Sequence, residues 1–502
     1  MLAVPGVVRS ILPASRQWRS SNRTTRRSPT DDFLLEIEAL FNGPLVLSNL
    51  LTLSQQLQAQ FKDRLSSSPI SMLPSYNHTL PRGDERGTYL ALDVGGSTLR
   101  VALVELAGRN EASEPMRISR MESWRIDDSV KLLTGNDFFD WMAGRIDEML
   151  SKDGSGYGHE KSPLPMGLAW SFPIEQTSIR SGTLLGMGKG FYAAHGVLGQ
   201  DLGDLIMQAC QRRDMNVKMD AIVNDASATL LSRAYLDPST RLALILGTGL
   251  NAAIHLPVTA LAPSKFGSRP QDWHDNAAHV LVNTELSMFG KGILPTTRWD
   301  EDLNATHLLP DFQPLEHLVS GRYLGEIVRL ILVEAVQTAG LFGGELPRGL
   351  SEPYAFATSI VAAIEADTSP CLASSRHLLS LHHPFTSPTT SPTHADLLFL
   401  QRVTRCVSRR AATYVATGIH ALWTLRISAE GLSPRNGGRV AIGCNGSVIE
   451  KYPDFSKTCQ ATIDSLVELS GGQTSSVVLE PAVESALFGA AVAVSCVESE
   501  RI

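Results

Sequence analysis

The sequence predicts an α/β fold made of two similar halves with a cleft between them. Two segments carry this prediction, LALDVGGSTLRVALVEL at residues 90–106 and LALILGTGLNAAIHLPV at residues 242–258. Each segment reads as an apolar strand, a turn of glycines and hydroxyl residues, and a second apolar strand. Helical patterns separate the two units, so the repeat indicates a duplicated core of strands and helices.

The residues before the first unit predict two amphipathic helices. Phe33, Ile37 and Phe41 share one helical face, and Asp31 stands at its N-terminal end, where a negative charge is stabilised. After the break at Gly43, apolar spacing continues over residues 47–61. Between the two strand–turn–strand units we expect strands at 116–126, 165–170 and 220–223, and helices at 132–149 and 202–212.

The second half repeats the alternation of strands and helices. After the second unit we expect a short strand at 279–285, helices at 320–334 and 395–425, a strand at 439–444, a strand near Val477 and an alanine-rich helix at 483–497. Residues 366–394 are rich in Ser, Pro, His and Thr, which predicts a mobile surface loop. The histidines of so biased a segment are weak evidence for a metal site.

These elements divide the chain into four parts. Residues 1–30 form a basic tail, 31–224 a small lobe that opens with the two helices, 225–482 a large lobe with the loop at 366–394, and 483–502 a C-terminal helix. The tail has arginines at 9, 16, 19, 23, 26 and 27 and no acidic residue. Its composition resembles a mitochondrial transit segment, but its prolines and weak apolar face favour a disordered tail.

Composition excludes several classes of function. The net charge of −7 gives no electrostatic footprint for nucleic acid. The six cysteines are scattered without a CxxC pair, which favours reduced thiols in a cytoplasmic protein over disulfides or a protein-bound metal. The longest uniformly apolar run, residues 486–494, is too short to span a bilayer. We therefore expect a cytoplasmic protein, and the basic tail leaves mitochondrial association open.

The first turn has the composition of a phosphate-binding turn. Glycine accepts positive φ and lets backbone N–H groups converge, and hydroxyl and guanidinium groups add donors for an anion. Neither a P-loop motif nor GxGxxG occurs in the chain. An ordinary hairpin is the alternative for this turn taken alone. The residues concerned are Asp93, Gly95, Gly96, Ser97, Thr98 and Arg100.

Other polar groups follow apolar strands. Asn224 and Asp225 end the strand at 220–223, which is where open α/β sheets present ligands, although Asp at this junction is also a favoured helix N-cap. Gly446 and Ser447 form a third glycine turn after the strand at 439–444. Converging N–H donors and a carboxylate base are what phosphoryl transfer to an alcohol requires.

Short blocks along the chain resemble the hexokinase family and occur in that family's order. They are DVGGSTLR, SFP (171–173), KGF (189–191), VND (223–225), GTGLNA (247–252), VNTE (282–285), PLEHLVSGRYLGEIVR (314–329) and NGSV (445–448). The resemblance runs from about residue 34 to residue 497. It implies a duplicated actin-like (ribonuclease H-like) ATPase core that transfers the γ-phosphate of ATP, carried with Mg²⁺, to the 6-hydroxyl of a hexose.

The resemblance also implies residue roles. Asp225 would be the base, with Lys189 and Arg100 also catalytic. Each residue taken singly also has a structural explanation, as a turn residue, a helix cap or a solvated charge. The implied sugar ligands are Ser171, Phe172, Lys189, Asn224, Asp225, Asn251, Glu285 and Glu316. The implied nucleotide contacts are Asp93, Gly95, Gly96, Ser97, Thr98, Arg100, Thr248, Gly446 and Ser447.

Two departures from the family pattern affect the expected function. Gly188 replaces a threonine and Leu286-Ser287 replaces Trp-Gly, which suggests a roomier sugar site and places N-acetylglucosamine ahead of glucose as substrate. Residues 483–491 replace Asp-Gly-Ser-Gly-Lys/Arg-Gly-Ala-Ala, with Ser485, Leu487 and Phe488 on the adenosine side. The alternative function is therefore a weakly active or inactive sugar-sensing protein that acts through regulatory protein partners.

Overall fold

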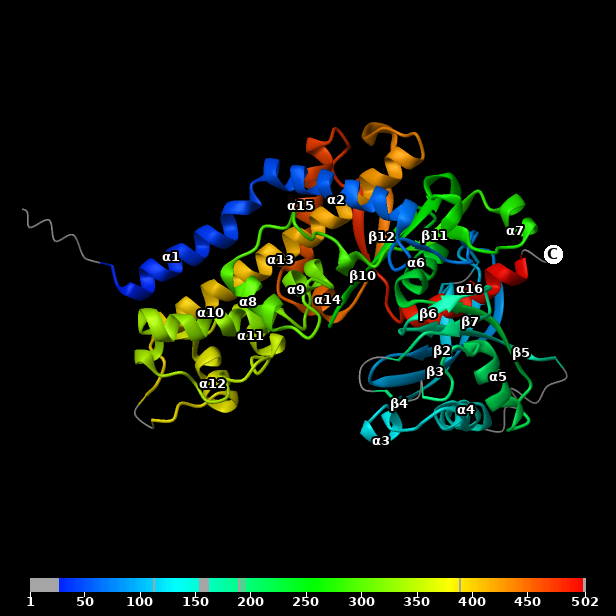
Figure 1. The fold of residues 1–502 in the computed structure, drawn as a ribbon, viewed down its shortest axis with the longest axis horizontal. Coiled ribbons are helices and arrows are strands. Elements are labelled where there is room, and N and C mark those ends of the chain that lie inside the picture. The colour runs from blue at the N-terminus through cyan, green and yellow to red at the C-terminus, as the bar shows by residue number, and fades with distance from the viewer. Residues whose placement is uncertain are drawn as a thin grey trace, which may run out of the picture.

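The computed structural model describes residues 27–111, 113–152, 162–187, 191–192, 195–387 and 390–499. They form two lobes, each built on one mixed β-sheet, and Figure 1 shows the large lobe with its long helices beside the smaller lobe. The predicted α/β fold is confirmed.

The two sheets share one strand order, which confirms the predicted duplication. In each sheet an antiparallel meander is extended by two strands parallel to its first strand. The small-lobe sheet runs β4 (Met116–Arg125), β3 (Thr98–Ala107), β2 (Arg86–Val94), β5 (Leu164–Trp170), β8 (Val217–Val223). The large-lobe sheet runs β11 (His279–Asn283), β10 (Leu250–Pro257), β9 (Thr240–Leu246), β12 (Val440–Asn445), β13 (Val477–Pro481), and β1 (Leu73–Pro74) adds an edge beyond β11.

Two helices lie between the sheets and join the lobes. α6 (Asp225–Leu236) packs on the large-lobe strands, and α16 (Ser485–Ser499) packs on α6 and on the small-lobe strands. The packing is close: a Cβ on Gly489 of α16 would lie 2.0 Å from the carbonyl oxygen of Ala228 in α6, and a Cβ on Gly167 of β5 would lie 2.2 Å from that of Ala490. Glycine at these two positions lets the backbones touch.

The outer face of the small-lobe sheet is covered by α4 (Asn136–Ser151) and α5 (Leu202–Gln211). Their apolar sides form one core with β2, β3 and β5, in which Phe138, Met142 and Ile206 are fully buried. The short helix α3 (Asp128–Lys131) precedes α4, and the hairpin β6 (Ile174–Gln176) and β7 (Gly182–Leu184) follows β5.

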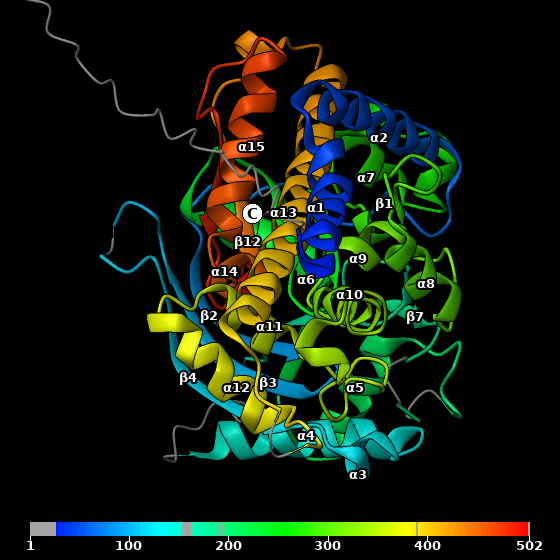
Figure 2. The ribbon, with the colours of Figure 1, turned by 90° about the vertical axis from the view of Figure 1, so that its left-hand side faces the viewer.

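The N-terminal helices belong to the large lobe, which corrects their assignment to the small lobe. α1 (Pro29–Asn42) and α2 (Leu47–Ser67) lie along the long helix α13 (His394–Ala429), as Figure 2 shows. Their buried residues, Phe41 and Phe61 among them, join the large-lobe core. The sequence reveals that these helices are amphipathic, but it does not reveal which apolar surface they pack against, which is here that of α13.

The other large-lobe helices are α7 (Gln271–Asn276), α8 (Arg298–Thr306), α9 (Pro314–Val319), α10 (Leu324–Ala339), α11 (Thr358–Glu365), α12 (Ala373–His382), α14 (Ser447–Lys451) and α15 (Phe455–Leu469).

Residues 366–394 are not only a loop, because they contain α12. The carboxylate of Asp367 accepts hydrogen bonds from the backbone N–H and hydroxyl of Ser375, both at 2.7 Å, and Leu379 is fully buried. The composition of this segment hides a short helix that is held by one buried carboxylate.

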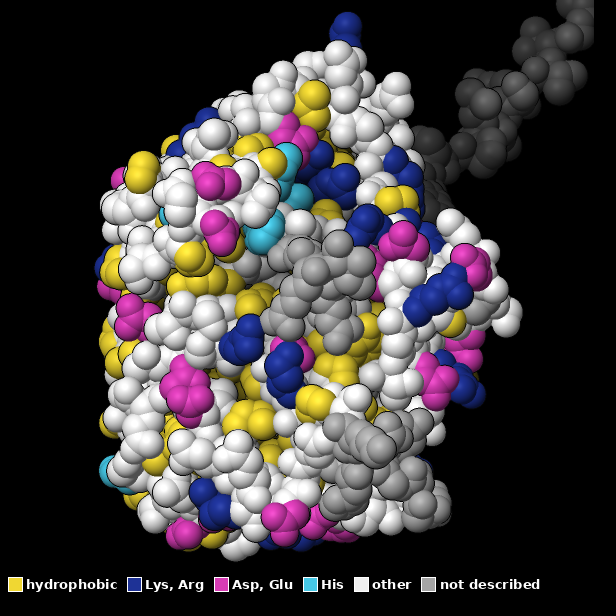
Figure 3. All heavy atoms as spheres, turned by 90° about the vertical axis from the view of Figure 1, so that its right-hand side faces the viewer, with side chains coloured by type: hydrophobic (Ala, Val, Ile, Leu, Met, Phe, Trp, Pro, Cys, Tyr) yellow, Lys and Arg dark blue, Asp and Glu magenta, His cyan; other side chains and the backbone are white. Residues whose placement is uncertain are grey.

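Within the described part of the chain, no single helix has the length and apolar character to cross a membrane. The bent pair Pro29–Leu45 and Leu47–Ser67 reaches the length and apolar character of a membrane span only when its two helices are counted together. No group of three or more His, Cys, Asp or Glu side chains that could hold a metal ion occurs among the described residues. Figure 3 shows basic and acidic side chains interspersed on the face turned to the right in Figure 1.

Candidate active site

Asn224 and Asp225 stand where β8 meets α6. Asn224 is the N-cap, and its side chain accepts a hydrogen bond from the backbone N–H of Ser227 at 2.9 Å. Asp225 is the first helical residue, and its Oδ1 accepts from the backbone N–H of Ala226 at 2.7 Å. Asn224 therefore fills the capping role that was the structural alternative for Asp225.

A chain of amides leads to Glu285. The side chain of Asn251 on β10 donates to Asn283 Oδ1 at 3.0 Å, and that of Asn283 at the end of β11 donates to Glu285 Oε1 at 2.7 Å. Glu285 has a left-handed backbone with φ of 52°. Asn283 is a site residue that the sequence analysis missed, and its signal was its place in VNTE, two residues before the carboxylate at a strand end.

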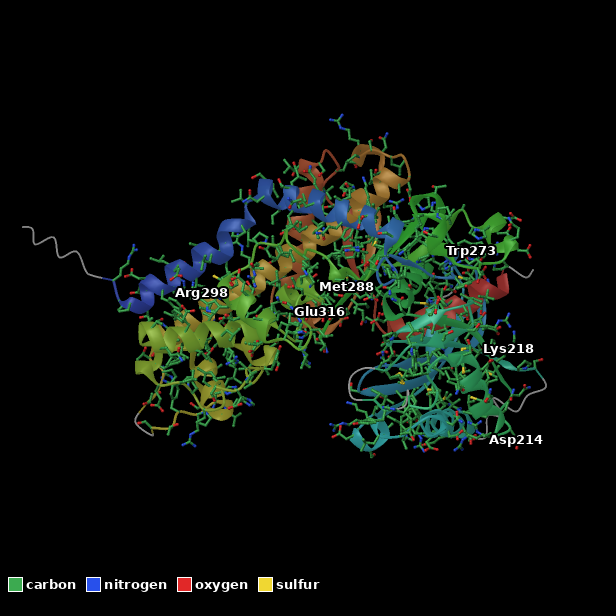
Figure 4. The ribbon with its side chains drawn as sticks, viewed as in Figure 1. Asp214, Lys218, Trp273, Met288, Arg298 and Glu316 are labelled. Carbon is green, nitrogen blue, oxygen red and sulfur yellow. The ribbon has the colours of Figure 1, made fainter. Side chains whose placement is uncertain are left out.

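Glu316 on α9 reaches the second glycine turn. Its Oε2 accepts from the backbone N–H of Leu250 at 2.7 Å, and a Cβ on Gly249 would lie 2.9 Å from the same oxygen. Glycine at 249 thus leaves room for this carboxylate at the turn, and a side chain there would push the carboxylate aside. Figure 4 places Glu316 on the side of the large lobe that faces the small lobe.

Three carboxylates come together at the lobe junction. Burial raises the pKa of Glu285 above its ordinary value, against the hydrogen bond from Asn283, and the charges of Asp225 and Glu316 raise it further. These carboxylates come from β8–α6, β11 and α9, so the fold gathers side chains that lie up to 91 residues apart in the sequence, from 225 to 316. Oxygen acceptors and amides in one place suit a ligand with several hydroxyl groups.

The SFP segment lies in the small lobe, directly after β5. The backbone N–H of Ser171 donates to the carbonyl of Val94 at 3.3 Å, which places Ser171 next to the first turn. The ring of Phe172 contacts that of Phe191 at 5.0 Å between centroids, so one residue of SFP packs on the last residue of KGF. Lys189 and Gly188 lie outside the described residues, and the role of Lys189 stays a prediction.

The first turn differs from its expected backbone. Gly95 does not have positive φ, and a Cβ on it would lie 3.7 Å from the carbonyl oxygen of Thr98 in ordinary contact. The backbone N–H of Gly95 donates to that oxygen at 3.0 Å, and the carbonyl of Ser97 accepts from Ile126 at 2.8 Å. Glycine at 95 therefore leaves the turn without a side chain rather than permitting an unusual φ.

Arg100 is held between two carboxylates. Its Nε and Nη2 donate to Asp93 Oδ2 at 2.9 and 2.6 Å, and its Nη1 donates to Glu484 Oε2. Burial alone would lower the pKa of Arg100, but the two carboxylates outweigh it and raise the pKa. Burial raises the pKa of Asp93, Arg100 opposes this rise, and Glu484 adds to it.

The second and third glycine turns meet in the large lobe. The backbone N–H of Gly321 donates to the carbonyl of Gly247 at 2.8 Å, and that of Arg322 donates to the carbonyl of Thr248 at 3.1 Å. Gly446 has φ of 125°, and a Cβ there would lie 2.4 Å from the carbonyl oxygen of Leu246. The following residue, Ser447, begins α14, so Thr248, Gly446 and Ser447 come together as the resemblance implied.

Two departures from the family pattern point away from the site. Leu286 is fully buried in the large-lobe core, and Leu487 is fully buried between α6, α16 and the small-lobe sheet. Ser485 is also buried and its hydroxyl bonds to that of Thr229 at 2.8 Å. Both side chains fill the core, so neither offers an exposed wall to a ligand, and the effect of these two substitutions on sugar and ATP stays a prediction.

Comparison with known proteins agrees with this geometry. Models of hexokinase match residues 42–235 and 241–496. Hexokinase-2 of Oryza sativa subsp. japonica is 31% identical over 95% of this chain and 93% of its own, and hexokinase-1 of Arabidopsis thaliana is 31% identical over 81% and 79%. The structure of a Schistosoma mansoni hexokinase complexed with glucose has a TM-score of 0.75 at 27% identity and covers 93% of this chain and 99% of that one.

These likenesses extend over both lobes and include the actin-like ATPase core. The glycine turns and the carboxylates at the lobe junction lie within the matched residues. The chain belongs to the hexokinase family and is a sugar kinase, a phosphotransferase with an alcohol group as acceptor.

Proposed function

We propose that this hexokinase phosphorylates the 6-hydroxyl of N-acetylglucosamine, with glucose as its next substrate and Mg²⁺-ATP as donor. The observation that supports a sugar site is the meeting of Asp225, Glu285 and Glu316 with the amide of Asn251. Such a set of acceptors and amides can fix the hydroxyls of a hexose while leaving one carboxylate for proton transfer.

Asp225 is the proposed base. It would take the proton of the 6-hydroxyl as the phosphorus–oxygen bond forms, while Glu285 and Glu316 hold other hydroxyls. The first helical turn of α6 keeps Asp225 fixed at the edge of β8. Lys189 belongs to the same proposal through the family resemblance.

The residues of the three glycine turns fit a nucleotide. Backbone N–H groups and the hydroxyls of Ser97, Thr248 and Ser447 are suitable donors for phosphate oxygens. The carboxylate of Asp93 is an oxygen ligand of the kind that Mg²⁺ takes, usually through water. Mg²⁺ would neutralise charge on the phosphates as the γ-phosphate is transferred.

The choice of N-acetylglucosamine now rests on Gly188, because Leu286 points into the core. Loss of the threonine side chain at 188 would leave space for a substituent on the sugar. Glucose has support of a different kind, since the similar Schistosoma mansoni structure is complexed with glucose.

A substrate panel tests the proposal. Values of kcat/KM would be measured with Mg²⁺-ATP for N-acetylglucosamine, glucose, mannose and fructose. We expect the highest value for N-acetylglucosamine, and Gly188→Thr should shift the ratio toward glucose. A preference of about tenfold or more for glucose, the scale of one pocket contact, would overturn the proposed sugar.

A weakly active or inactive sugar-sensing protein is the second candidate function. The observation that favours it is the pairing of Arg100 with Glu484, which occupies a guanidinium expected at the phosphates. In this case the same protein would bind sugar in calorimetry, convert none of the panel, and act through regulatory protein partners.

We also propose a cytoplasmic location, with residues 1–30 as a candidate mitochondrial address. The support is compositional: six arginines and no acid. Fusion of residues 1–30 to a fluorescent protein would test the address, and diffuse fluorescence would contradict it.

A further inference from the structure

Glu484 occupies a strained position on the segment that crosses from the large lobe to the small lobe. It lies between β13 and α16 and has φ of 49°, in the left-handed region that disfavours residues with a Cβ. The backbone conformation turns the chain into α16, and the Glu484 side chain pairs with Arg100 on β3.

Arg100 is the third residue of β3, directly after the first glycine turn. Nε and Nη2 are committed to Asp93, and Nη1 is committed to Glu484. The side chains of Arg100 and Glu484 are 28% and 34% exposed, so solvent and solutes reach the pair. An ion pair with this exposure exchanges partners at little cost.

The charges of the three groups do not balance. Asp93 and Glu484 bring two negative charges against the one positive charge of Arg100. A polyphosphate that approaches Arg100 must therefore displace a carboxylate and also meets an excess negative charge. A neutral side chain at 484 would remove both obstacles.

We propose that Glu484 is a specificity-determining residue for the nucleotide, because it competes with phosphate oxygens for Arg100. This inference rests on the proposed function, in which Arg100 contacts the phosphates of ATP. Glu484 lowers the affinity for nucleotide and sets the ATP concentration at which the site fills. ATP and ADP both meet this competition, and the comparison of the two nucleotides measures how strongly it depends on their charge.

Glu484→Gln tests the inference with Mg²⁺-ATP and Mg²⁺-ADP binding measured by calorimetry. We expect the variant to bind Mg²⁺-ATP about fivefold more tightly, the upper range for one exposed charge contact. The gain should shrink as salt is raised, because the competing charges are solvent-accessible. Glu484→Gly, which also relieves the positive φ, should give the same gain in affinity together with a higher Tm.

Glu480→Gln is the matched control. Glu480 lies on β13 and pairs with Arg233 at 3.3 Å and Arg439 at 2.9 Å, so the variant loses one carboxylate without changing Arg100. Its affinity for Mg²⁺-ATP should equal that of the unmodified protein.

Each result decides between clear alternatives. Equal affinity of Glu484→Gln and the unmodified protein would overturn the inference and leave the kinase proposal intact. Weaker Mg²⁺-ATP binding by Glu484→Gln would also overturn it, since the carboxylate would then assist the bound nucleotide. Failure of all variants to bind nucleotide, with sugar binding retained, would overturn both the inference and the proposed ATP site.

Discussion

Asp225, the proposed base, is the first residue of α6. The N-cap of α6 is Asn224, so the carboxylate of Asp225 is not needed to begin the helix. Asp225→Asn keeps the shape of the side chain, and we expect kcat to fall about 10²–10⁴-fold, the usual contribution of a general base. Sugar affinity should change little, as calorimetry with the preferred sugar would show.

Asp237→Asn, at the other end of α6, is the control for Asp225→Asn. Asp237 pairs with Arg439 at the C-terminal end of α6, whereas Asp225 is at the N-terminal end beside Glu285 and Glu316, so kcat should be unchanged. Turnover by Asp225→Asn equal to that of the control would contradict the assignment of the base.

At the residue scale, the sequence predicts polar residues that end strands better than it predicts apolar substitutions. Asn224 and Glu285 follow apolar strands and Asn251 stands at the start of β10, and sheet geometry then brings them together. The directions of Leu286 and Leu487 depend on how the next element turns, and both side chains enter the core. The chemical type and size of a side chain can be read from the sequence, whereas the direction in which a loop side chain points cannot.

Single buried contacts fix the helices of the large lobe. Arg410 on α13 forms a bidentate ion pair with Asp300 on α8 at 2.6 and 2.7 Å, and both side chains are 1% exposed. The Arg410 guanidinium also lies 4.3 Å from the ring centroid of Phe41 on α1. The Arg410 guanidinium thus holds α13, α8 and α1 together.

Asp300→Ala should strongly destabilise the large lobe. It leaves Arg410 buried without its carboxylate, and loss of one partner of a buried pair costs about 3–5 kcal/mol. Urea unfolding would measure the loss. Asp454→Asn, which breaks the exposed pair with Lys457, is the control and should leave the midpoint unchanged. Equal midpoints for the two variants would contradict the role given to the pair.

His420 joins α13 to two other elements and predicts a pH dependence. Its Nδ1 bonds to the hydroxyl of Ser54 on α2 at 2.7 Å and its Nε2 to that of Ser470 after α15 at 3.0 Å. Burial lowers the pKa of His420 from 6.5 to about 4. Below pH 6.5 the unfolded chain therefore binds a proton at His420 that the folded chain does not bind. The free energy of unfolding falls as pH decreases from 6.5 and levels off below about 4.

His420→Gln should remove this part of the pH dependence. The contribution is about 1.4 kcal/mol per pH unit within that window, and urea unfolding at pH 7, 6 and 5 would measure it. The stability of the unmodified protein and of the variant should converge toward low pH. His382→Gln, at an exposed histidine of α12, should keep the full slope. A His420→Gln slope equal to that of the control would count against the assignment.

At the scale of elements, hydrophobic periodicity predicts the helices and strands but not their partners. Residues 90–106 and 242–258 form the two hairpins, and residues 395–425 lie within α13, as expected. The placement of α1 and α2 against α13 depends on contacts between residues more than 300 positions apart, such as Phe33 with Phe399. Local pattern contains no information on such contacts.

At the scale of the whole molecule, the proposed sugar ligands lie on both lobes, and this predicts that the lobes close on the sugar. Ser171 comes from the small lobe, whereas Asn251, Glu285 and Glu316 come from the large lobe, so a sugar held by all of them draws the lobes together. The radius of gyration measured by small-angle scattering should fall on saturation with the preferred sugar. Glu285→Gln with Glu316→Gln should abolish the change, and an unchanged radius for the unmodified protein would contradict closure.

The duplication was visible in the sequence because two hairpins repeat, and the strand order of both sheets follows it. The division into lobes was less accessible, since each lobe is built from segments that are far apart in the chain. α1 and α2 precede the small-lobe sheet but pack in the large lobe, and α16 follows the large-lobe sheet but packs on the small one.

The position of α16 has a consequence for biosynthesis. The small-lobe sheet is formed by residues 86–223, yet one of its faces is covered only when residues 485–499 have been made. During translation that face stays exposed while residues 224–484, more than half of the chain, are synthesised. The apolar faces of α1 and α2 likewise stay exposed until α13 has been synthesised. Neither lobe can finish folding as an N-terminal unit on the ribosome. We therefore expect the nascent chain to expose this apolar face until α16 leaves the ribosomal exit tunnel, and exposed apolar surface of this kind is what chaperones bind.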